Sequence, residues 1–347
     1  MSLSLTLLLM LGGDERAPGA PAGSGALLRA SEDGAPELGI LLRPFYTFSA
    51  KEGGLGSEDV SGSVFEDLDL WLGQWTRAFA WKVSADLEDG SAALEDAWAR
   101  VRLREDVGLT VGQFKPRVVR SGSILEEALL FRSRTFLGAA FDVWDDGFEL
   151  ATHGERWSAT LALVDGANGS ESDHFWSLRG EWELYESDLA EREGARGAEN
   201  FLVSRLGVAT FADVSQSAQD GGGLAFDLAL TYGPYSLAAE WAHLQDEFTR
   251  EVDVFNGHVF DLGDGDPMSF TFARRVGAEL EAALRYQRAE DADDTTATLL
   301  AVTWARKGAA ARFVAEAGLV EAESRDFTIL SAGVVVGGSG MGRGLEE

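Results

Sequence analysis

The chain has 347 residues, of which 58 are acidic and 29 basic, so its net charge at pH 7 is -29. This excess of acid argues against a nucleic-acid partner. The sequence contains no cysteine, which excludes disulfides and thiolate metal ligands. No apolar run reaches the roughly 18 residues that a transmembrane helix needs.

The first residues are expected to be an export signal. A leucine-rich core runs from Leu3 to Leu11, and Ala20-Pro21-Ala22 is similar to a cleavage site, although no basic residue precedes Arg16. We therefore interpret residues 1–22 as a signal peptide. Residues 23–36 are expected to form a flexible lead-in, residues 37–337 one β-barrel domain, and residues 338–347 a glycine-rich tail.

Alternating apolar and polar residues recur through residues 37–337 and predict strands, because a period of two puts each kind of side chain on its own face of a sheet. Most segments are long enough to cross a bilayer at a tilt. We expect sixteen strands, at 38–49, 64–72, 76–87, 94–104, 107–115, 141–152, 156–165, 173–184, 200–210, 222–232, 234–245, 249–260, 274–288, 295–305, 308–319 and 326–337.

The clearest two-faced segment is 94–104. Small and apolar residues, Ala97, Ala99, Val101 and Leu103, alternate there with Arg100, Arg102 and Arg104. A helix would scatter these arginines, whereas a strand places them on one face. Charge on one face and apolar groups on the other are typical of a wall with water on one side and lipid on the other.

Connections and tryptophans fit a membrane barrel as well. Long connections at 50–63 and 116–140 contrast with short ones such as Gly233, as in barrels with long external loops and tight turns at the other end. Tryptophans near the ends of the expected strands are typical of interface girdles; they are Trp71, Trp81, Trp144, Trp176, Trp182, Trp241 and Trp304.

Four motifs carry a family resemblance. The sequence L-E-D-A-W-A-R-V at 94–101, followed by V-G-Q-F-K-P at 111–116, resembles the phosphate-selective porin O and P family. S-I-L-E-E-A-L-L-F-R-S-R at 123–134 and E-R-W-S-A-T-L-A-L-V-D-G at 155–166 keep the order of that family. The resemblance implies an outer-membrane barrel of sixteen strands in a Gram-negative-type cell, commonly a homotrimer, with the loop after the fifth strand folded inward as a constriction.

Charge placement predicts the solute. Eight basic and four acidic residues lie between Arg100 and Arg134, although the rest of the chain is strongly acidic. Because a narrow pore focuses the field of nearby charges, we expect arginines to line the pore and bind small inorganic or organic anions such as phosphate. They are Arg100, Arg102, Arg104, Arg117, Arg120, Arg132 and Arg134.

A cation-preferring pore is the alternative for selectivity. Nine acids also fall on the inward faces: Asp67, Asp69, Asp86, Asp96, Glu181, Glu183, Asp227, Glu279 and Glu281. These carboxylates could outweigh the arginines, or pair with them and leave a weakly selective sieve.

The remaining alternatives are a non-transporting barrel or β-sandwich that acts as a structural or sugar-binding surface protein, and an outer-membrane enzyme. The four histidines are scattered and form no catalytic motif, so we expect no enzyme and no cofactor. The acids at 261–266 lack the bidentate glutamate of a calcium loop, so we expect no metal.

Overall fold

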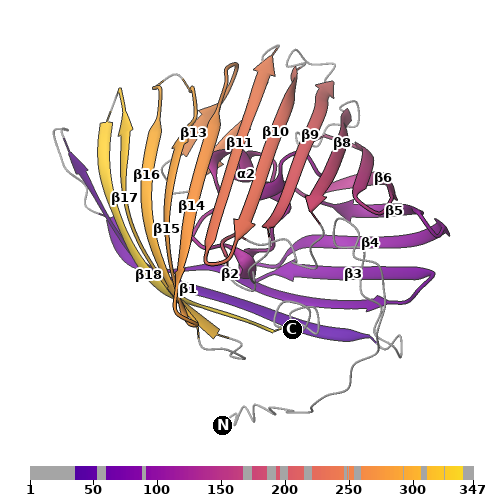
Figure 1. Cartoon of the computed structure of the whole chain (residues 1–347), viewed down its shortest axis with the longest axis horizontal. Helices are drawn as coiled ribbons and strands as arrows, with labels where there is room; N and C mark the ends of the chain where they lie inside the picture. The colour runs from indigo at the N-terminus through magenta and orange to yellow at the C-terminus, as the bar shows by residue number, and fades with distance from the viewer. Residues whose placement is uncertain are drawn as a thin grey trace, which may run out of the picture.

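The computed structural model describes residues 36–52, 60–87, 91–166, 174–185, 193–195, 202–214, 221–245, 248, 250–253, 259–291, 293–305, 311–323 and 325–338. Within these ranges sixteen antiparallel strands close one barrel (Figure 1). The barrel strands are β1 (Glu37–Glu52), β2 (Val60–Trp75), β3 (Phe79–Asp86), β4 (Ala93–Arg104), β5 (Val107–Phe114), β6 (Asp145–His153), β7 (Trp157–Val164), β8 (His174–Tyr185), β9 (Leu202–Val214), β10 (Gly221–Tyr232), β11 (Tyr235–Gln245), β14 (Met268–Val276), β15 (Leu280–Arg288), β16 (Thr296–Trp304), β17 (Ala311–Ala322) and β18 (Arg325–Gly338).

Each barrel strand pairs with its neighbour in the sequence, and β1 pairs with β18 to close the wall. Between β11 and β14 the chain forms a separate two-stranded sheet, β12 (Arg250–Asp253) and β13 (Val259–Leu262). Short turns join β2 to β3, β4 to β5, β6 to β7, β10 to β11 and β14 to β15 at one end of the barrel, called the turn end below. The connection from β5 to β6 leaves from the opposite end.

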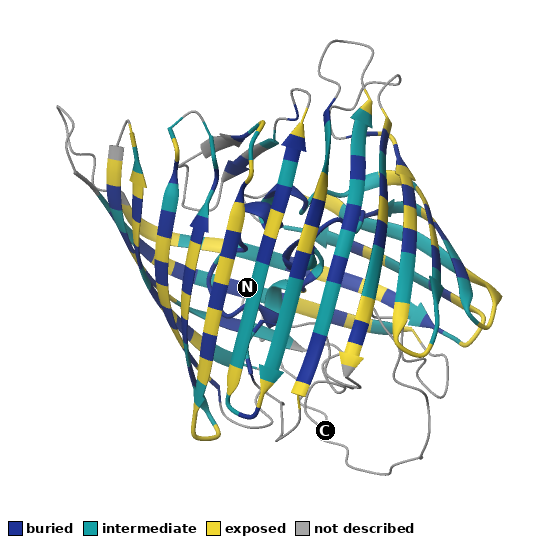
Figure 2. Cartoon of the chain, turned by 45° about the horizontal axis from the view of Figure 1, so that its top comes forward, coloured by how far each residue is buried: buried dark blue, intermediate teal, exposed yellow. Residues whose placement is uncertain are grey.

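Buried and exposed residues alternate along the wall strands (Figure 2). In β16, Ala297, Leu299 and Ala301 are buried on the inner face, while Leu300 and Val302 are exposed on the outer face. Side chains on the outside of the other strands are also mostly apolar, which suits contact with hydrocarbon chains. Among the described residues, no helix is long and apolar enough to cross a bilayer.

Aromatic side chains gather on the outer face at the turn end of the barrel. Trp157 pairs with Trp182, Tyr232 with Tyr235, and Trp304 with Phe313, and all six are exposed. Rings in such a band can place one edge in lipid and the other in water. Two tryptophans that the sequence assigned to the girdle face inward instead: Trp71 is buried against Trp75, and Trp144 stacks under the ammonium of Lys115.

The expected number of strands is right, but two of the sixteen ranges are wrong. The range 249–260 is not a wall strand, since it covers β12 and the start of β13. The range 274–288 covers the end of β14 and all of β15, which meet at a turn where Gly277 has a φ of 76°. Alternation continues across that tight turn, so the sequence pattern hides it. The signal peptide, the lead-in up to residue 35 and the tail from residue 339 lie outside the described residues.

The loop after β5 folds into the barrel, as expected. Residues 115–144, called the inner loop below, contain α1 (Arg120–Ser123), the 3-10 helix η2 (Glu126–Ala128) and α2 (Phe136–Ala140). Figure 1 shows α2 behind β10 and β11, inside the wall. The inner loop's apolar residues Ile124, Leu129, Leu130 and Phe131 are buried, whereas Leu125 is exposed.

Candidate functional site: the lumen and its inner loop

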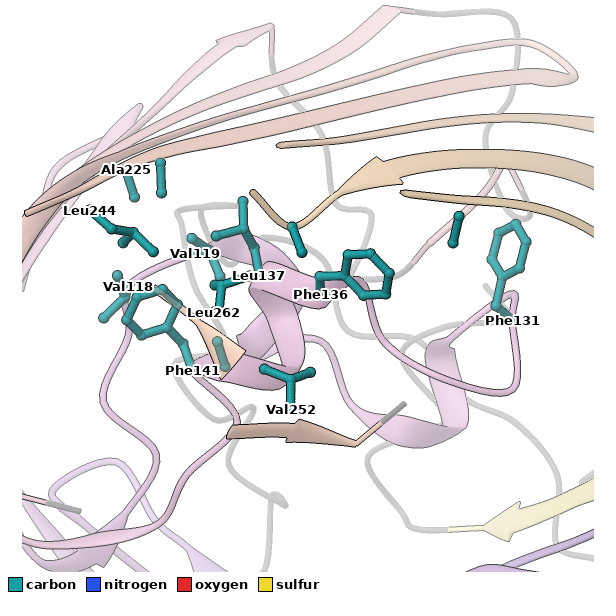
Figure 3. Close-up of a cluster of buried hydrophobic side chains, with 14 of the residues drawn as sticks. Val118, Val119, Phe131, Phe136, Leu137, Phe141, Ala225, Leu244, Val252 and Leu262 are labelled. Carbon is teal, nitrogen blue, oxygen red and sulfur yellow. The ribbon is translucent and has the colours of Figure 1, made fainter. Parts of the chain in front are cut away.

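Apolar packing holds the inner loop against one side of the wall. Figure 3 shows Val118, Leu137 and Phe141 beside Ala225 and Leu244 of β10 and β11. Many inward residues from β7 to β16 are alanines, which leave room for the loop to approach: Ala162, Ala209, Ala225, Ala242, Ala273, Ala283, Ala297 and Ala301. The strands β8–β11 and β14–β16, which we call the packed half, therefore enclose a core of loop and wall side chains.

Hydrogen bonds from wall side chains to the loop backbone fix its position. Glu240 of β11 accepts from Ser121 through the backbone N at 2.7 Å and through Oγ at 2.6 Å. Glu316 of β17 accepts from the N of Arg132 at 3.0 Å, and Thr303 of β16 donates to the carbonyl of Leu130 at 3.1 Å. These wall groups satisfy backbone groups that a loop inside a barrel would otherwise leave unpaired.

A buried arginine of the wall anchors the start of the loop. Arg179 of β8 donates to Asp227 at 2.6 Å, to Glu181 at 2.7 Å and to the carbonyl of Val118 at 2.7 Å. Arg179 and Asp227 each expose only 2% of the side chain. Because both charges are paired and shielded, they serve to hold the loop and cannot meet a passing solute.

The loop also carries an ion-pair network of its own. Arg134 pairs with Glu126 and, at 2.7 Å, with Asp142, and Lys115 pairs with the same two acids. Burial opposes the charge of Glu126, but Arg134 and Lys115 hold the pKa of that carboxyl well below its usual value of 4.5. For Glu127, burial and the neighbouring Glu126 both raise the pKa. Two adjacent glutamates in η2 thus have opposite shifts.

The wall opposite the packed half is polar, and two β-bulges shape it. The pairing of β1 with β2 shifts between Leu42 and Pro44, so Glu66 and Asp67 both lie opposite Arg43. The pairing of β3 with β4 shifts in the same way, and Glu95 and Asp96 both lie opposite Ser84. A bulge sets two residues against one. The result is an inward group of carboxylates that we call the acidic lane: Glu66, Asp67, Asp69, Glu95 and Asp96.

The acidic lane is only partly neutralised. Arg43 pairs with Asp67, Lys82 with Asp96 at 2.6 Å, and Arg132 with Glu66 at 2.6 Å. Asp69 is buried, and its Oδ1 has no hydrogen-bond partner among the described residues. Glu95 receives a long contact of 3.5 Å from Ser84 Oγ. The carboxyl groups of Glu95, Asp67, Glu126 and Asp86 lie near Asp69, so this side of the lumen is rich in carboxyl groups.

Fewer arginines of β4 face the middle of the lumen than the sequence predicts. Val101 and Leu103 are exposed on the outer face, as the register predicts. Arg100 points inward and binds Glu149 at 2.9 Å and Thr110 at 2.7 Å. Arg102 lines a small cavity of about 30 Å³ at the turn end, together with Arg77 and Arg100. Arg104 lies at the rim, 76% exposed, beside Asp106.

The four loop arginines divide into two pairs. Arg132 and Arg134 are buried and held by loop and wall carboxylates, so they are structural anchors of the loop. Arg117 and Arg120 are half-buried. The charge of Arg117 acts on Arg100 and Glu181, and that of Arg120 acts on Glu240. The structure thus brings Arg117 close to Arg100.

Several polar residues of the lumen were missed by the sequence interpretation. Glu66 and Glu95 were missed because bulges break the period of two that the prediction assumed. Glu279, expected to face inward, lies in a turn and accepts from the outer Trp304 at 3.2 Å. Arg179, Arg285, Glu149, Glu240 and Glu316 are buried on inner faces, and the signal for them was a charge at an inward position of a strand.

No group of carboxylates or histidines among the described residues could hold a metal ion. Of the acids at 261–266, Asp266 binds His243 at 2.8 Å and, through its backbone N, Glu290 at 2.6 Å. The arrangement provides charged and polar side chains along one side of a closed wall, and so it could conduct ions or other small hydrophilic solutes.

No family model and no curated protein sequence matches the chain. Solved structures do match. The loop L8 deletion mutant of OmpT, an outer membrane protein of Vibrio cholerae, matches with a TM-score of 0.57 and 16% identity over 88% of this chain and 99% of that one. An anion-selective porin from Comamonas acidovorans matches with a TM-score of 0.57 and 9% identity over the same shares.

A third match is Salmonella typhi OmpF in complex with daunomycin, with a TM-score of 0.55 and 12% identity over 88% of this chain and 99% of that one. At these identities the likeness concerns the fold. The chain therefore has the fold of outer-membrane β-barrels: one closed antiparallel barrel with an inward-folded loop after β5.

Proposed function

We propose that the protein is a porin of the Gram-negative-type outer membrane, without enzymatic activity, through which small hydrophilic solutes diffuse passively. The observation that carries this proposal is the pair of wall surfaces: the outside of the barrel is apolar, while its inside bears charged groups where the inner loop does not pack. A sixteen-stranded barrel is wide enough for an aqueous channel around a loop.

The solute path that we propose runs between the inner loop and strands β2–β6, which we call the polar half. Side chains there keep part of their surface open: Asp67, Lys82, Asp96 and Arg100 are 12–19% exposed. In the packed half, Arg179, Asp227 and Arg285 are only 0–2% exposed. Water and ions can reach the first group of side chains but not the second.

Cation preference is the selectivity that the geometry supports better. Most of the expected anion-binding arginines are paired with carboxylates, while Asp69 and Glu95 in the acidic lane have no cationic partner within hydrogen-bonding range among the described residues. Carboxyl groups beside a narrow path concentrate cations there when they are ionised.

Anion preference, which the sequence predicts, is the second candidate. Its support is the cluster of Arg77, Arg100 and Arg102 around one cavity at the turn end, with Arg117 nearby. Arg has a donor fork that suits phosphate. The resemblance of residues 94–166 to the phosphate-selective porin O and P family supports the same solute class, and it also supports a homotrimer.

Conductance in a planar bilayer tests the proposal. The purified barrel is first checked by its heat-dependent migration in detergent gels, which reports folding. Stepwise current increments are then expected in symmetric salt, and the reversal potential in a salt gradient gives the sign of selectivity. A folded barrel that inserts without conducting would favour the non-transporting alternative. Cross-linking in detergent tests the trimer.

A further inference from the structure

A second segment of the chain lies inside the barrel. It is Glu193–Ala195, called the brace below, which belongs to the connection between β8 and β9. That connection leaves from the turn end, because β8 ends beside the start of β7, where Trp157 pairs with Trp182. The inner loop comes from the opposite end. The two segments therefore approach each other from the two mouths of the barrel.

The brace touches the inner loop directly. The backbone N of Glu193 donates to the carbonyl of Ala128 at 3.2 Å, and the carboxylate of Glu193 accepts from the N of Leu130 at 2.9 Å. Two hydrogen bonds thus join one residue of the brace to a single turn of the loop. Glu193 is buried, so these bonds are shielded from water.

The brace is also fixed to the far wall. The carboxylate of Glu193 pairs with Arg285 of β15 at 2.6 Å, and the N of Ala195 donates to Glu281 of the same strand at 2.5 Å. In the barrel order, β10, β11 and β14 separate β9 from β15, so the brace contacts a strand that is not adjacent to β8 or β9. Glu281 and Arg285 are about 13 Å apart along β15, so the brace is attached to that strand at two separate points.

Local backbone geometry matches this close approach. Gly194 has a φ of 91°, and a Cβ atom at that position would lie 2.5 Å from Glu281 Oε1. Glycine is therefore the residue that can hold both the left-handed conformation and the contact.

Arg285 is the point where wall, loop and brace meet. Its side chain is fully buried, its guanidinium lies 3.9 Å from the ring centre of Phe131, and it donates to the carbonyl of Ser133 at 2.8 Å as well as to Glu193. An arginine with this many partners in a dry site depends on its carboxylate, because removal of Glu193 leaves a buried charge short of a partner.

From these contacts, and given the proposed porin function, we infer that the constriction has two parts: the inner loop from one mouth and the brace from the other. Glu193 is the positioning residue that locks them together through Arg285. The packed half stays closed to solutes because the brace holds the inner loop from the turn end. Loss of the Glu193 carboxylate should loosen both segments at once and open additional space on that side.

Cysteine labelling tests the brace without relying on conductance, since the natural chain has no cysteine. Ala195→Cys places a thiol at a fully buried position of the brace, and Glu155→Cys places one at an exposed position of a short turn at the same end. A membrane-impermeant maleimide should label the second much faster than the first. Equal rates would overturn the inference.

The thiol of Ala195→Cys also tests whether Glu193 holds the brace and the inner loop together. Adding Glu193→Gln to Ala195→Cys should raise the labelling rate about tenfold or more, equivalent to about 1.4 kcal/mol of lost protection. Adding Glu155→Gln should leave it unchanged. An unchanged rate with Glu193→Gln would overturn the role of Glu193, provided that heat-dependent migration shows a folded barrel.

Conductance separates this inference from the porin proposal. If the unmodified barrel conducts, Glu193→Gln should increase the single-channel conductance and its fluctuation, and Glu155→Gln should not. Arg285→Gln should reproduce the effect, and the double variant should add little to either, since both remove one interaction. An unmodified barrel that does not conduct would contradict the porin proposal alone. A conducting barrel whose conductance is unchanged by Glu193→Gln would contradict the role of Glu193.

Discussion

Both halves of the barrel are built from alternating strands, but their inner faces have different roles. In the packed half, inward alanines and paired charges bind the inner loop and bury it. In the polar half, bulges on β2 and β4 turn pairs of acids inward, and their side chains remain partly open. One wall therefore holds the constriction in place, and the other is left for the solute. The comparison implies that stability and selectivity can be changed separately.

Packing in the first half should give the largest effect. Phe136 of α2 is buried between loop and wall, so Phe136→Ala should cost about 3–5 kcal/mol. The temperature at which the barrel loses its compact migration in detergent gels should fall. Leu125 is an exposed residue of the same loop, and Leu125→Ala should leave that temperature unchanged. Equal shifts for both variants would mean that the loop is not held by this core.

The outer face provides the next test, because both halves share it. Leu300 is 58% exposed in the middle of β16, and Leu300→Arg should cost about 2–4 kcal/mol in a bilayer. Insertion into lipid vesicles should fall accordingly. Leu38 lies near the end of β1, where water is close, so Leu38→Arg is the matched control. Tolerance of arginine at Leu300 would contradict a lipid-facing wall.

A smaller effect on selectivity is expected from the acidic lane. Replacing Asp69→Asn together with Glu95→Gln should weaken the cation preference in an alkaline buffer, where both carboxyls are ionised. The reversal potential should shift accordingly, and the folding temperature should stay nearly constant. Glu105→Gln removes an acid from the turn between β4 and β5 and should have little influence. If the double variant left selectivity unchanged while Arg100→Ala weakened an anion preference, the anion-selective alternative would replace this account.

The smallest expected effect is that of mild acid. Burial and Glu126 raise the pKa of Glu127, so Glu127 should become neutral at a higher pH than an exposed glutamate, and cation preference should weaken slightly as the pH is lowered. The pKa of Glu126 is held well below 4.5, so its ion pairs keep stabilising the loop above that pH. That stability is lost only as the pH falls through the lowered pKa. Glu127→Gln should remove the mild-acid response.

Sequence patterns predicted the wall far better than the lumen. Alternation in β4 placed Val101 and Leu103 outside and Arg100 inside, and the family resemblance implied the inward loop after the fifth strand. Pattern alone failed where the backbone departs from strict pleating: at the turn of Gly277 and at the bulges beside Arg43 and Ser84. The sequence also did not predict which charges pair, because ion pairs such as Arg132 with Glu66 join residues that are far apart in the chain.

Thiol block of the ionic current tests the central claim most directly. Asp96→Cys places a thiol in the polar half and Ala225→Cys places one in the packed half, both on inner faces of the wall. A charged methanethiosulfonate added during recording should reduce the current through the first variant and leave the second unchanged. Block at Ala225→Cys with none at Asp96→Cys would show that solutes take the other side, and it would contradict the account.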